Sequence, residues 1–198
     1  FLQGGGRGNG DTKGEMELLN FMEEMNKKAS SYGGAVLSLI GNHEVMNLMG
    51  DFRYASENDI QSVGGLSVRE KIFKPGGELF NRLSCTRNVV VKIGSWVFVH
   101  AGIHPKHILE FKNQADNVDN NISGNEWIHS INNLMRLFMQ GVKTTNDREI
   151  KNLFLDKTGV IWDRDYGSST PSCTVWDKTS RLLDVNNIVV GHTIQDTI

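Results

Sequence analysis

The chain has 198 residues, 38% of them hydrophobic, which is enough to bury the core of one ordinary domain. Its formal net charge of -2 provides no basic surface for a phosphate backbone, so we expect no nucleic-acid partner. No apolar run approaches the roughly 20 residues that span a bilayer, so the sequence predicts no membrane anchor and favours a cytoplasmic protein.

The first part of the chain predicts a loop, a helix and a buried strand. Five glycines fall within residues 4–10, a composition too flexible for the interior of a helix or strand. From residue 15 to about residue 30, apolar side chains recur near helical spacing, and the glycine pair 33–34 ends that pattern. The apolar run 35–40 then predicts a strand, and this order is typical of a sheet covered by helices.

The middle of the chain predicts short helices followed by a hairpin. Residues 51–81 are polar, and we expect loops there with short helices near 68–73 and 78–83. Two apolar segments, 88–93 and 95–100, flank Gly94 and predict paired strands joined by a tight turn.

The second half of the sequence is mostly helical in pattern. Residues 105–142 carry an apolar stripe, and a further short helix is expected over 147–155, so we interpret about 105–155 as a helical insertion in a single domain that spans 1–198. A loop at 168–172, a helix over 177–184 and a final strand over 187–190 complete the expected order. We expect Trp96 and Trp127 to lie in the core. The stripe consists of Trp127, Ile128, Ile131, Leu134, Leu137 and Phe138.

A histidine lies at the end of each of three predicted strands. The tetrapeptide Gly41-Asn42-His43-Glu44 follows the run 35–40, His100 follows 96–99, and His192 follows 187–191. An amide oxygen can enter a metal's coordination shell, while an adjacent imidazole can donate a proton to a leaving group. Amide and imidazole ligands suit Mn, Fe or Zn. The pattern therefore predicts a metal site for phosphoester cleavage.

The same motifs resemble a known enzyme family. In chain order, Gly41-Asn42-His43-Glu44, His100-Ala101-Gly102 and Gly191-His192 resemble the later motifs of the calcineurin-like metallophosphoesterases of the phosphoprotein phosphatase type. The fourteen residues 41–54 resemble the Shewanella-like protein phosphatases in particular. The resemblance, which extends from about Arg7 to His192, implies an α/β (α+β) fold: a four-layered αββα arrangement with metals at the strand ends.

The resemblance also implies a reaction and roles for single residues. Asn42, His100 and His192 resemble the ligands of the second of two metals, and His43 resembles the proton donor to the leaving alkoxide. The implied enzyme is a metal-dependent phosphoprotein phosphatase. It hydrolyses phosphomonoesters of Ser or Thr, or of Tyr, by a metal-activated water. We expect Mn²⁺ as the metal, with Fe or Zn as alternatives, and a phosphorylated protein or peptide as the partner.

Two arginines resemble phosphate clamps, but the neighbouring carboxylates are missing. Arg7 resembles the arginine that ends the family's Asp-Arg-Gly motif, and Arg164, in the segment 162–164, resembles a second clamp. The family's Gly-Asp-x-His-Gly motif would precede Phe1, and glycines occupy the place of two aspartates at 4–6. We interpret the chain as a fragment truncated at both ends, with one identifiable metal site and little turnover of its own.

Two alternative functions remain open from the sequence. One is a phosphoesterase of the same fold that acts on a small molecule, such as a dinucleoside polyphosphate. The other is a degenerate, non-catalytic module that binds phosphorylated partners, which the glycine run favours. His104 and His107 also have spacing that could mimic a metal site, but no adjacent acid completes a ligand set, so we favour a loop that enters a helix.

Overall fold

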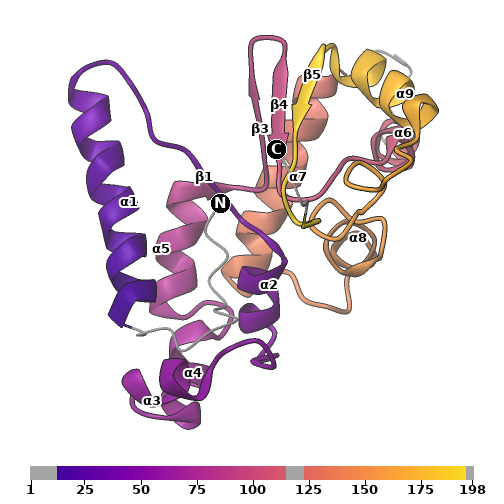
Figure 1. The fold of residues 1–198 in the computed structure, drawn as a ribbon. Helices are drawn as coiled ribbons and strands as arrows, with labels where there is room; N and C mark the ends of the chain where they lie inside the picture. Colours follow the sequence, from indigo (N-terminus) through magenta and orange to yellow (C-terminus); the bar gives the residue numbers. More distant parts are fainter. Residues whose placement is uncertain (1–12, 115–122, 195–198) are drawn as a thin grey trace.

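The computed structural model describes residues 13–114 and 123–194, which form a mixed α/β structure with two small sheets (Figure 1). The predicted glycine-rich loop at 4–10 lies outside the described residues. The two sheets have two and three strands, so the full αββα sandwich that the sequence led us to expect is not evident in this part of the chain.

The described elements follow one another in the order helix, strand, helices, hairpin, helices and final strand. The strands are β1 (Ser38–Leu39), β2 (Arg87–Asn88), β3 (Val90–Ile93), β4 (Trp96–Val99) and β5 (Asn187–Val189). The helices are α1 (Lys13–Ser31), α2 (Asn42–Leu48), α3 (Glu57–Ser62), α4 (Leu66–Phe73), α5 (Glu78–Thr86), α6 (Pro105–Gln114), α7 (Gly124–Met139), α8 (Arg148–Ile150) with the π-helix Lys151–Leu155, and α9 (Cys173–Leu183).

Most of the predicted elements are confirmed, but helix α3 was not predicted, and three further elements differ from the expectation. The predicted strand 35–40 is paired only over β1, because its partner β2 is equally short and the chain bends at Val89 before β3 begins. Helix α9 begins four residues earlier than predicted, since the Ser172 hydroxyl accepts a hydrogen bond from the Val175 N–H and caps it. Helix α2 was not predicted, although Gly41 and Glu44 have the spacing of a capping box.

The strand pairing brings distant segments of the chain together. The hairpin of β3 and β4 turns at Gly94, whose φ of +57° is left-handed and favours glycine. Strand β5 adds to β4 in parallel, with Phe98 opposite Val189, and β1 pairs with β2 in parallel. The carboxyl ends of β1, β4 and β5 therefore lie near the centre of the molecule, and the segments that follow these strands begin there (Figure 1).

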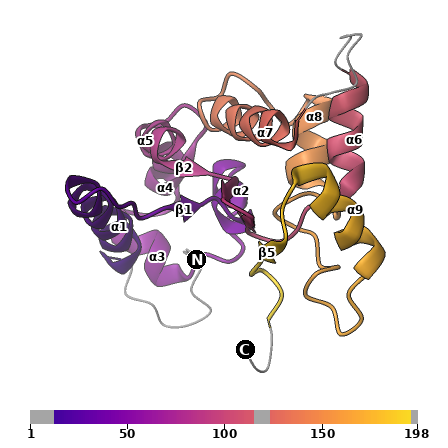
Figure 2. The same ribbon diagram turned by 90° about the horizontal axis from the view of Figure 1, so that it is seen from above.

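Helix α7 provides much of the core. It lies between α5 on one side and α6 on the other (Figure 2). The predicted stripe is confirmed: Trp127 is 1% exposed, and Leu134 is among the partly buried members. The expectation for Trp96 is wrong, since this side chain is 47% exposed. Alternate residues of a strand face opposite sides, and Trp96 shares the outer face with Phe98, at a ring-centroid distance of 6.4 Å.

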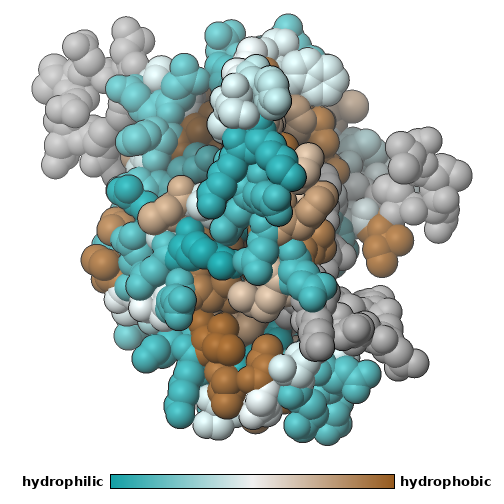
Figure 3. Space-filling view, turned by 90° about the vertical axis from the view of Figure 1, so that its left-hand side faces the viewer, coloured by the Kyte–Doolittle hydropathy of each residue, from teal (hydrophilic) through white to brown (hydrophobic). Residues whose placement is uncertain are grey.

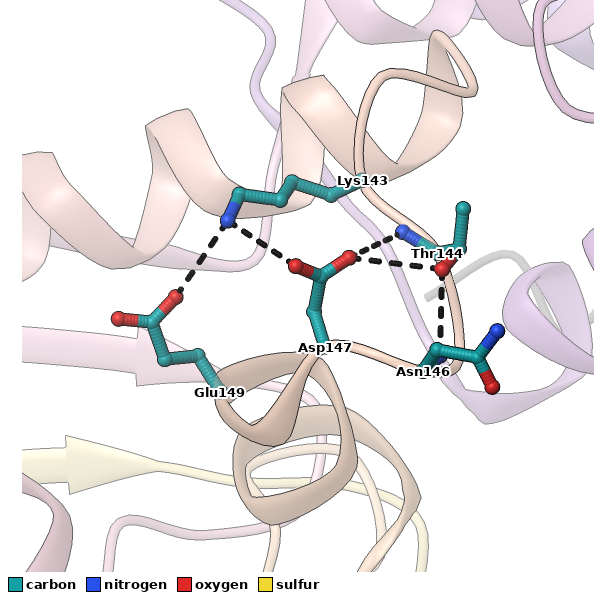
Figure 4. Close-up of polar contacts among 5 residues, drawn as sticks. All are labelled: Lys143, Thr144, Asn146, Asp147 and Glu149. Atoms are coloured by element: carbon teal, nitrogen blue, oxygen red, sulfur yellow. Dashed lines mark hydrogen bonds and ion pairs between the residues drawn. The ribbon is translucent and has the colours of Figure 1, made fainter.

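A compact turn fixes the start of α8. The Asp147 carboxylate accepts hydrogen bonds from the Thr144 N–H at 2.7 Å and from Lys143 Nζ at 3.1 Å (Figure 4). Lys143 Nζ also lies 3.9 Å from a Glu149 oxygen, and the Asn146 N–H donates to the Thr144 hydroxyl. Exposed pairs of this kind contribute little stability, so their effect is to define where the helix begins.

The face that carries α1 is mixed in character, with hydrophilic side chains interrupted by smaller hydrophobic areas (Figure 3). On α1 itself, Leu18 and Phe21 are about half exposed. Single exposed apolar residues are common on the surfaces of folded proteins and need no special explanation. In the part of the chain that the structure describes, no helix is both long enough and apolar enough to cross a membrane.

Asn132 of α7 joins the helix to the bend between the two sheets. Its Oδ1 accepts from the N–H groups of Val89 and Val90 at 2.9 and 3.0 Å, and its Nδ2 donates to the Val90 carbonyl at 2.8 Å.

We expect Asn132→Leu to lower the free energy of unfolding by about 2–4 kcal/mol, because each buried backbone group left unpaired costs about 1–3 kcal/mol. Urea unfolding would measure this loss. Asn125→Ala, on the exposed first turn of α7, is the matched control, and equal losses in the two variants would contradict this role of Asn132.

Candidate metal centre

The ends of three strands converge on a cluster of neutral ligating atoms. Asn42 follows β1, His100 follows β4 and His192 follows β5. The Nε2 atom of His100 lies 2.8 Å from Asn42 Oδ1 and 3.2 Å from His192 Nδ1. Asn42 and His100 are each 4% exposed, and His192 is half-buried. The structure thus brings together the three residues that the sequence predicted as metal ligands.

Gly41 allows the His100 imidazole to lie against the start of α2. It is the N-cap of that helix, and its N–H donates to Glu44 Oε2 at 2.8 Å. A Cβ atom built on Gly41 would meet His100 Nδ1 at 2.9 Å and Cε1 at 3.0 Å. Any larger residue at position 41 would therefore push the imidazole away from Asn42.

His192 is held in an unusual backbone conformation. Its φ of +58° lies in the left-handed region, which few residues other than glycine adopt, and such outliers are concentrated at functional sites. The turn is anchored to β4, because the Gly191 N–H donates to the His100 carbonyl at 2.9 Å. The ring of Trp162 meets the His192 ring edge-on, with centroids 5.9 Å apart.

The environment keeps both imidazoles neutral. Burial lowers the pKa of His100 to about 3, with smaller contributions from His192 and His43. Burial also lowers the pKa of His192 to about 4, with contributions from the positive charge of Arg164 and from His43. A histidine must be deprotonated to bind a metal, so at neutral pH both rings are in the binding form.

The two separations measured from His100 Nε2 can be compared with those between the ligands of one divalent metal ion. Two ligand atoms that each lie about 2.1 Å from a first-row metal, at right-angled to tetrahedral positions, are about 3.0–3.4 Å apart. The separations of 2.8 and 3.2 Å are close to these values. Three protein ligands leave further coordination positions for water or for a phosphoryl oxygen.

The cluster contains no carboxylate in the part of the chain described. Residues 13–114 and 123–194 contain no group of three or more His, Cys, Asp and Glu side chains arranged to hold a metal. The Nε2 atom of His192 is also buried without a hydrogen-bond partner among these residues. The described residues therefore bring together the three predicted ligands of one metal position, and no carboxylate-containing ligand group for the family's other position is found among them.

The other predicted site residues have different placements. His43, one residue after Asn42, is half-buried, and its ring stacks on Tyr54 with centroids 5.1 Å apart and planes within 2°. Arg164 is exposed, and its effect on the pKa of His192 places its charge near that ring. Arg7 lies outside the described residues. The stack of Tyr54 on His43 was not predicted, and nothing in the sequence pattern except its place in the resembling string 41–54 indicates it.

The second pair of histidines does not join the cluster. His107 lies on α6, and its Nε2 is 2.8 Å from the Thr158 carbonyl. The ring of His104 contacts that of His107 at a centroid distance of 6.4 Å. Because His104 precedes α6 directly, the predicted loop that enters a helix is confirmed, but His107 is buried rather than solvated.

Comparisons with known proteins were made for sequence and for structure. None of the protein-family models matches the chain. An uncharacterized protein of Acanthamoeba polyphaga mimivirus is 36% identical over 197 residues, which covers 88% of this chain and 75% of the viral protein. Shewanella-like protein phosphatase 2 of Arabidopsis thaliana is 23% identical over 92% of this chain and 54% of the plant protein.

A solved structure matches the fold over most of the chain. The cold-active protein-tyrosine phosphatase of a psychrophilic Shewanella species superposes with a TM-score of 0.69 and 27% sequence identity. The match covers 92% of this chain and 51% of the Shewanella chain. The chain thus spans three quarters of its viral relative and about half the length of the plant and bacterial phosphatases.

The close contact at Gly41 gives a prediction for metal affinity. We expect Gly41→Ala to weaken Mn²⁺ binding by about 10- to 100-fold, the usual cost of disturbing the groups that orient a ligand, because the new methyl group displaces His100. Isothermal titration calorimetry would measure the change. Gly34→Ala is the matched control, since a Cβ there meets atoms only at 3.5 Å or beyond. Unchanged affinity in Gly41→Ala would contradict the placement of His100.

The lowered histidine pKa values predict how stability depends on pH. In the unfolded chain His100 and His192 take up protons near pH 6.5, whereas in the folded chain they do so only near pH 3 and 4. The unfolded state therefore binds more protons in this window, and stability falls as the pH falls below about 6.5. Urea unfolding of chelator-treated protein from pH 7 to 5 would show this slope. His100→Gln should have a shallower slope, and an unchanged slope would refute the assignment.

Proposed function

Because the chain belongs to the family of the Shewanella-like protein phosphatases, we propose that it carries half of the catalytic centre of a metal-dependent phosphoprotein phosphatase. The observation that supports this most strongly is the convergence of Asn42, His100 and His192 at 2.8 and 3.2 Å, directly beside His43. Metal ligands next to an independent imidazole are the groups used in metal-assisted hydrolysis of a phosphomonoester.

The proposed reaction divides its tasks among the residues of this cluster. A divalent metal held by Asn42, His100 and His192 would supply Lewis acidity toward a phosphoryl oxygen. A water molecule forms a new P–O bond and releases one proton to the solvent. The ester P–O bond breaks, its electron pair passes to the leaving oxygen, and His43 donates a ring N–H proton to that oxygen. Because His43 is adjacent to Asn42 on the first turn of α2, the donor is fixed relative to the ligand set.

The phosphate group is held by charge in this proposal. The Arg164 guanidinium, whose positive charge helps to lower the pKa of His192, binds two phosphoryl oxygens at once. Burial keeps His100 neutral, so the metal retains its ligand at physiological pH. Arg7, outside the described residues, remains a second proposed clamp. The substrate is a phosphorylated protein or peptide, since one relative bears the name of a protein phosphatase and another that of a protein-tyrosine phosphatase.

A second candidate function is phosphate-dependent binding without turnover. It is favoured by the lack of a carboxylate in the described part of the cluster, because two-metal catalysis uses carboxylates to assemble both ions. A module of this kind would hold a phosphorylated partner through one metal and Arg164, and would leave the phosphoester bond intact.

Turnover by the natural full-length protein tests the proposal. With Mn²⁺ and phosphoserine or phosphotyrosine peptides, we expect His43→Asn to lower kcat by about 10²- to 10⁴-fold, the usual contribution of a proton donor. His129→Asn, on the exposed face of α7, is the control and should leave kcat unchanged. A wild-type protein that binds these peptides without cleaving them would favour the binding module. Preferred cleavage of a dinucleoside polyphosphate would favour the small-molecule alternative.

A further inference from the structure

We propose that Tyr54 is a positioning residue that holds the His43 imidazole in the orientation from which it donates its proton. This inference rests on the proposed role of His43 as proton donor. The two rings are stacked, with centroids 5.1 Å apart and an interplanar angle of 2°. The nitrogen atoms of an imidazole donate and accept in the plane of the ring, so a partner on its face fixes the ring and leaves that plane open.

The stack is not a contact of the hydrophobic core. Tyr54 is 41% exposed, and His43 is half-buried at the start of α2. A large aromatic side chain left at the surface gains little from burial, so its position over another ring calls for a specific cause. The parallel arrangement resists rotation of the imidazole about its χ2 angle, which would move the donor nitrogen away from the leaving oxygen.

The segment that carries Tyr54 contains a local ion pair and is hydrogen-bonded to α2. The Asp51 carboxylate accepts from Arg53 Nε at 2.9 Å and lies 2.8 Å from Arg53 Nη2. The Asp51 N–H donates to the carbonyl of Met46 in α2 at 2.8 Å. The chain therefore turns back over α2 immediately before Tyr54, which delivers the phenol ring to the helix that bears His43.

A buried guanidinium ties the two ring-bearing segments together. Arg69 is 1% exposed, and its guanidinium carbon lies 5.4 Å from the centroid of the Phe52 ring, two residues before Tyr54. The same guanidinium donates through Nη2 to Asn47 Oδ1 at 2.7 Å, and Asn47 Nδ2 donates to the His43 carbonyl at 2.8 Å. One rigid, desolvated group thus contacts both the segment of Tyr54 and the helix of His43.

If Tyr54 positions His43, the loss of rate on replacing Tyr54 depends on the leaving group of the substrate. A purely structural role of Tyr54 would not produce this dependence. When a serine phosphoester is cleaved, the departing alkoxide is strongly basic and needs a proton as the P–O bond breaks. The 4-nitrophenolate ion leaves without this help. A misplaced imidazole should therefore slow the first reaction and spare the second, whereas a general disturbance of the site should slow both equally.

The experiment compares two substrates in the Mn²⁺-loaded full-length protein. We expect Tyr54→Leu to lower kcat for a phosphoserine peptide by about 10-fold or more, a part of the usual contribution of a proton donor, with little change in KM. The loss with 4-nitrophenyl phosphate should be less than about twofold. Tyr54→Phe should restore the peptide rate, because the ring stack remains. Tyr32→Leu, at a tyrosine that is 92% exposed, is the control. Equal losses on both substrates, or no rescue by phenylalanine, would overturn the proposal.

A second readout separates this inference from the proposed function. Ring protons that lie over an aromatic face have shifted NMR resonances, so the His43 ring protons should move in Tyr54→Leu and stay in place in Tyr54→Phe. If the His43 ring-proton resonances are the same in the wild type and in Tyr54→Leu, the proposed stacking of Tyr54 on His43 is wrong. If the wild type cleaves no phosphoester, the proposed function fails, and the NMR comparison alone decides whether Tyr54 positions the ring.

Discussion

The parallel pairing of β4 with β5 is the constraint on which the rest of the site depends. Phe98 lies opposite Val189. Two residues further along each segment, the Gly191 N–H donates to the His100 carbonyl at 2.9 Å. This bond helps to bring His100 Nε2 and His192 Nδ1, from distant parts of the sequence, within 3.2 Å of each other. The left-handed backbone of His192 is tolerated because the strand pairing before it and the ring of Trp162 beside it hold the turn.

The chemistry of the site follows from the neutrality of its ligands. In the proposed site, a divalent ion bound by an amide oxygen and two uncharged imidazoles would keep its positive charge, and Arg164 adds a second positive charge nearby. Such a site attracts a phosphate group whether or not it cleaves the ester. In the proposed mechanism, catalysis depends further on the carboxylates of the second metal position and on the orientation of His43, whose contacts in the described residues include Tyr54 and the chain of contacts through Arg69.

Histidines at strand ends leave a clear pattern in the sequence, and the structure brings Asn42, His100 and His192 together as expected, while their role as metal ligands stays a prediction. The sequence also predicted α7, whose apolar period is strong. It missed what depends on three-dimensional context. The contact of His100 with Gly41 joins residues far apart in the chain, and the outward face of Trp96 is set by which side of the sheet is covered. Helix α2 has a weak start signal in the sequence, because its N-cap residue Gly41 has no side chain to cap the helix.

The most direct test of the account is a crystal structure of the protein grown with Mn²⁺, with anomalous diffraction recorded at the manganese edge. We expect an anomalous peak within bonding distance, about 2.0–2.2 Å, of Asn42 Oδ1, His100 Nε2 and His192 Nδ1. A manganese ion bound elsewhere while these three atoms remain bonded only to one another would contradict it.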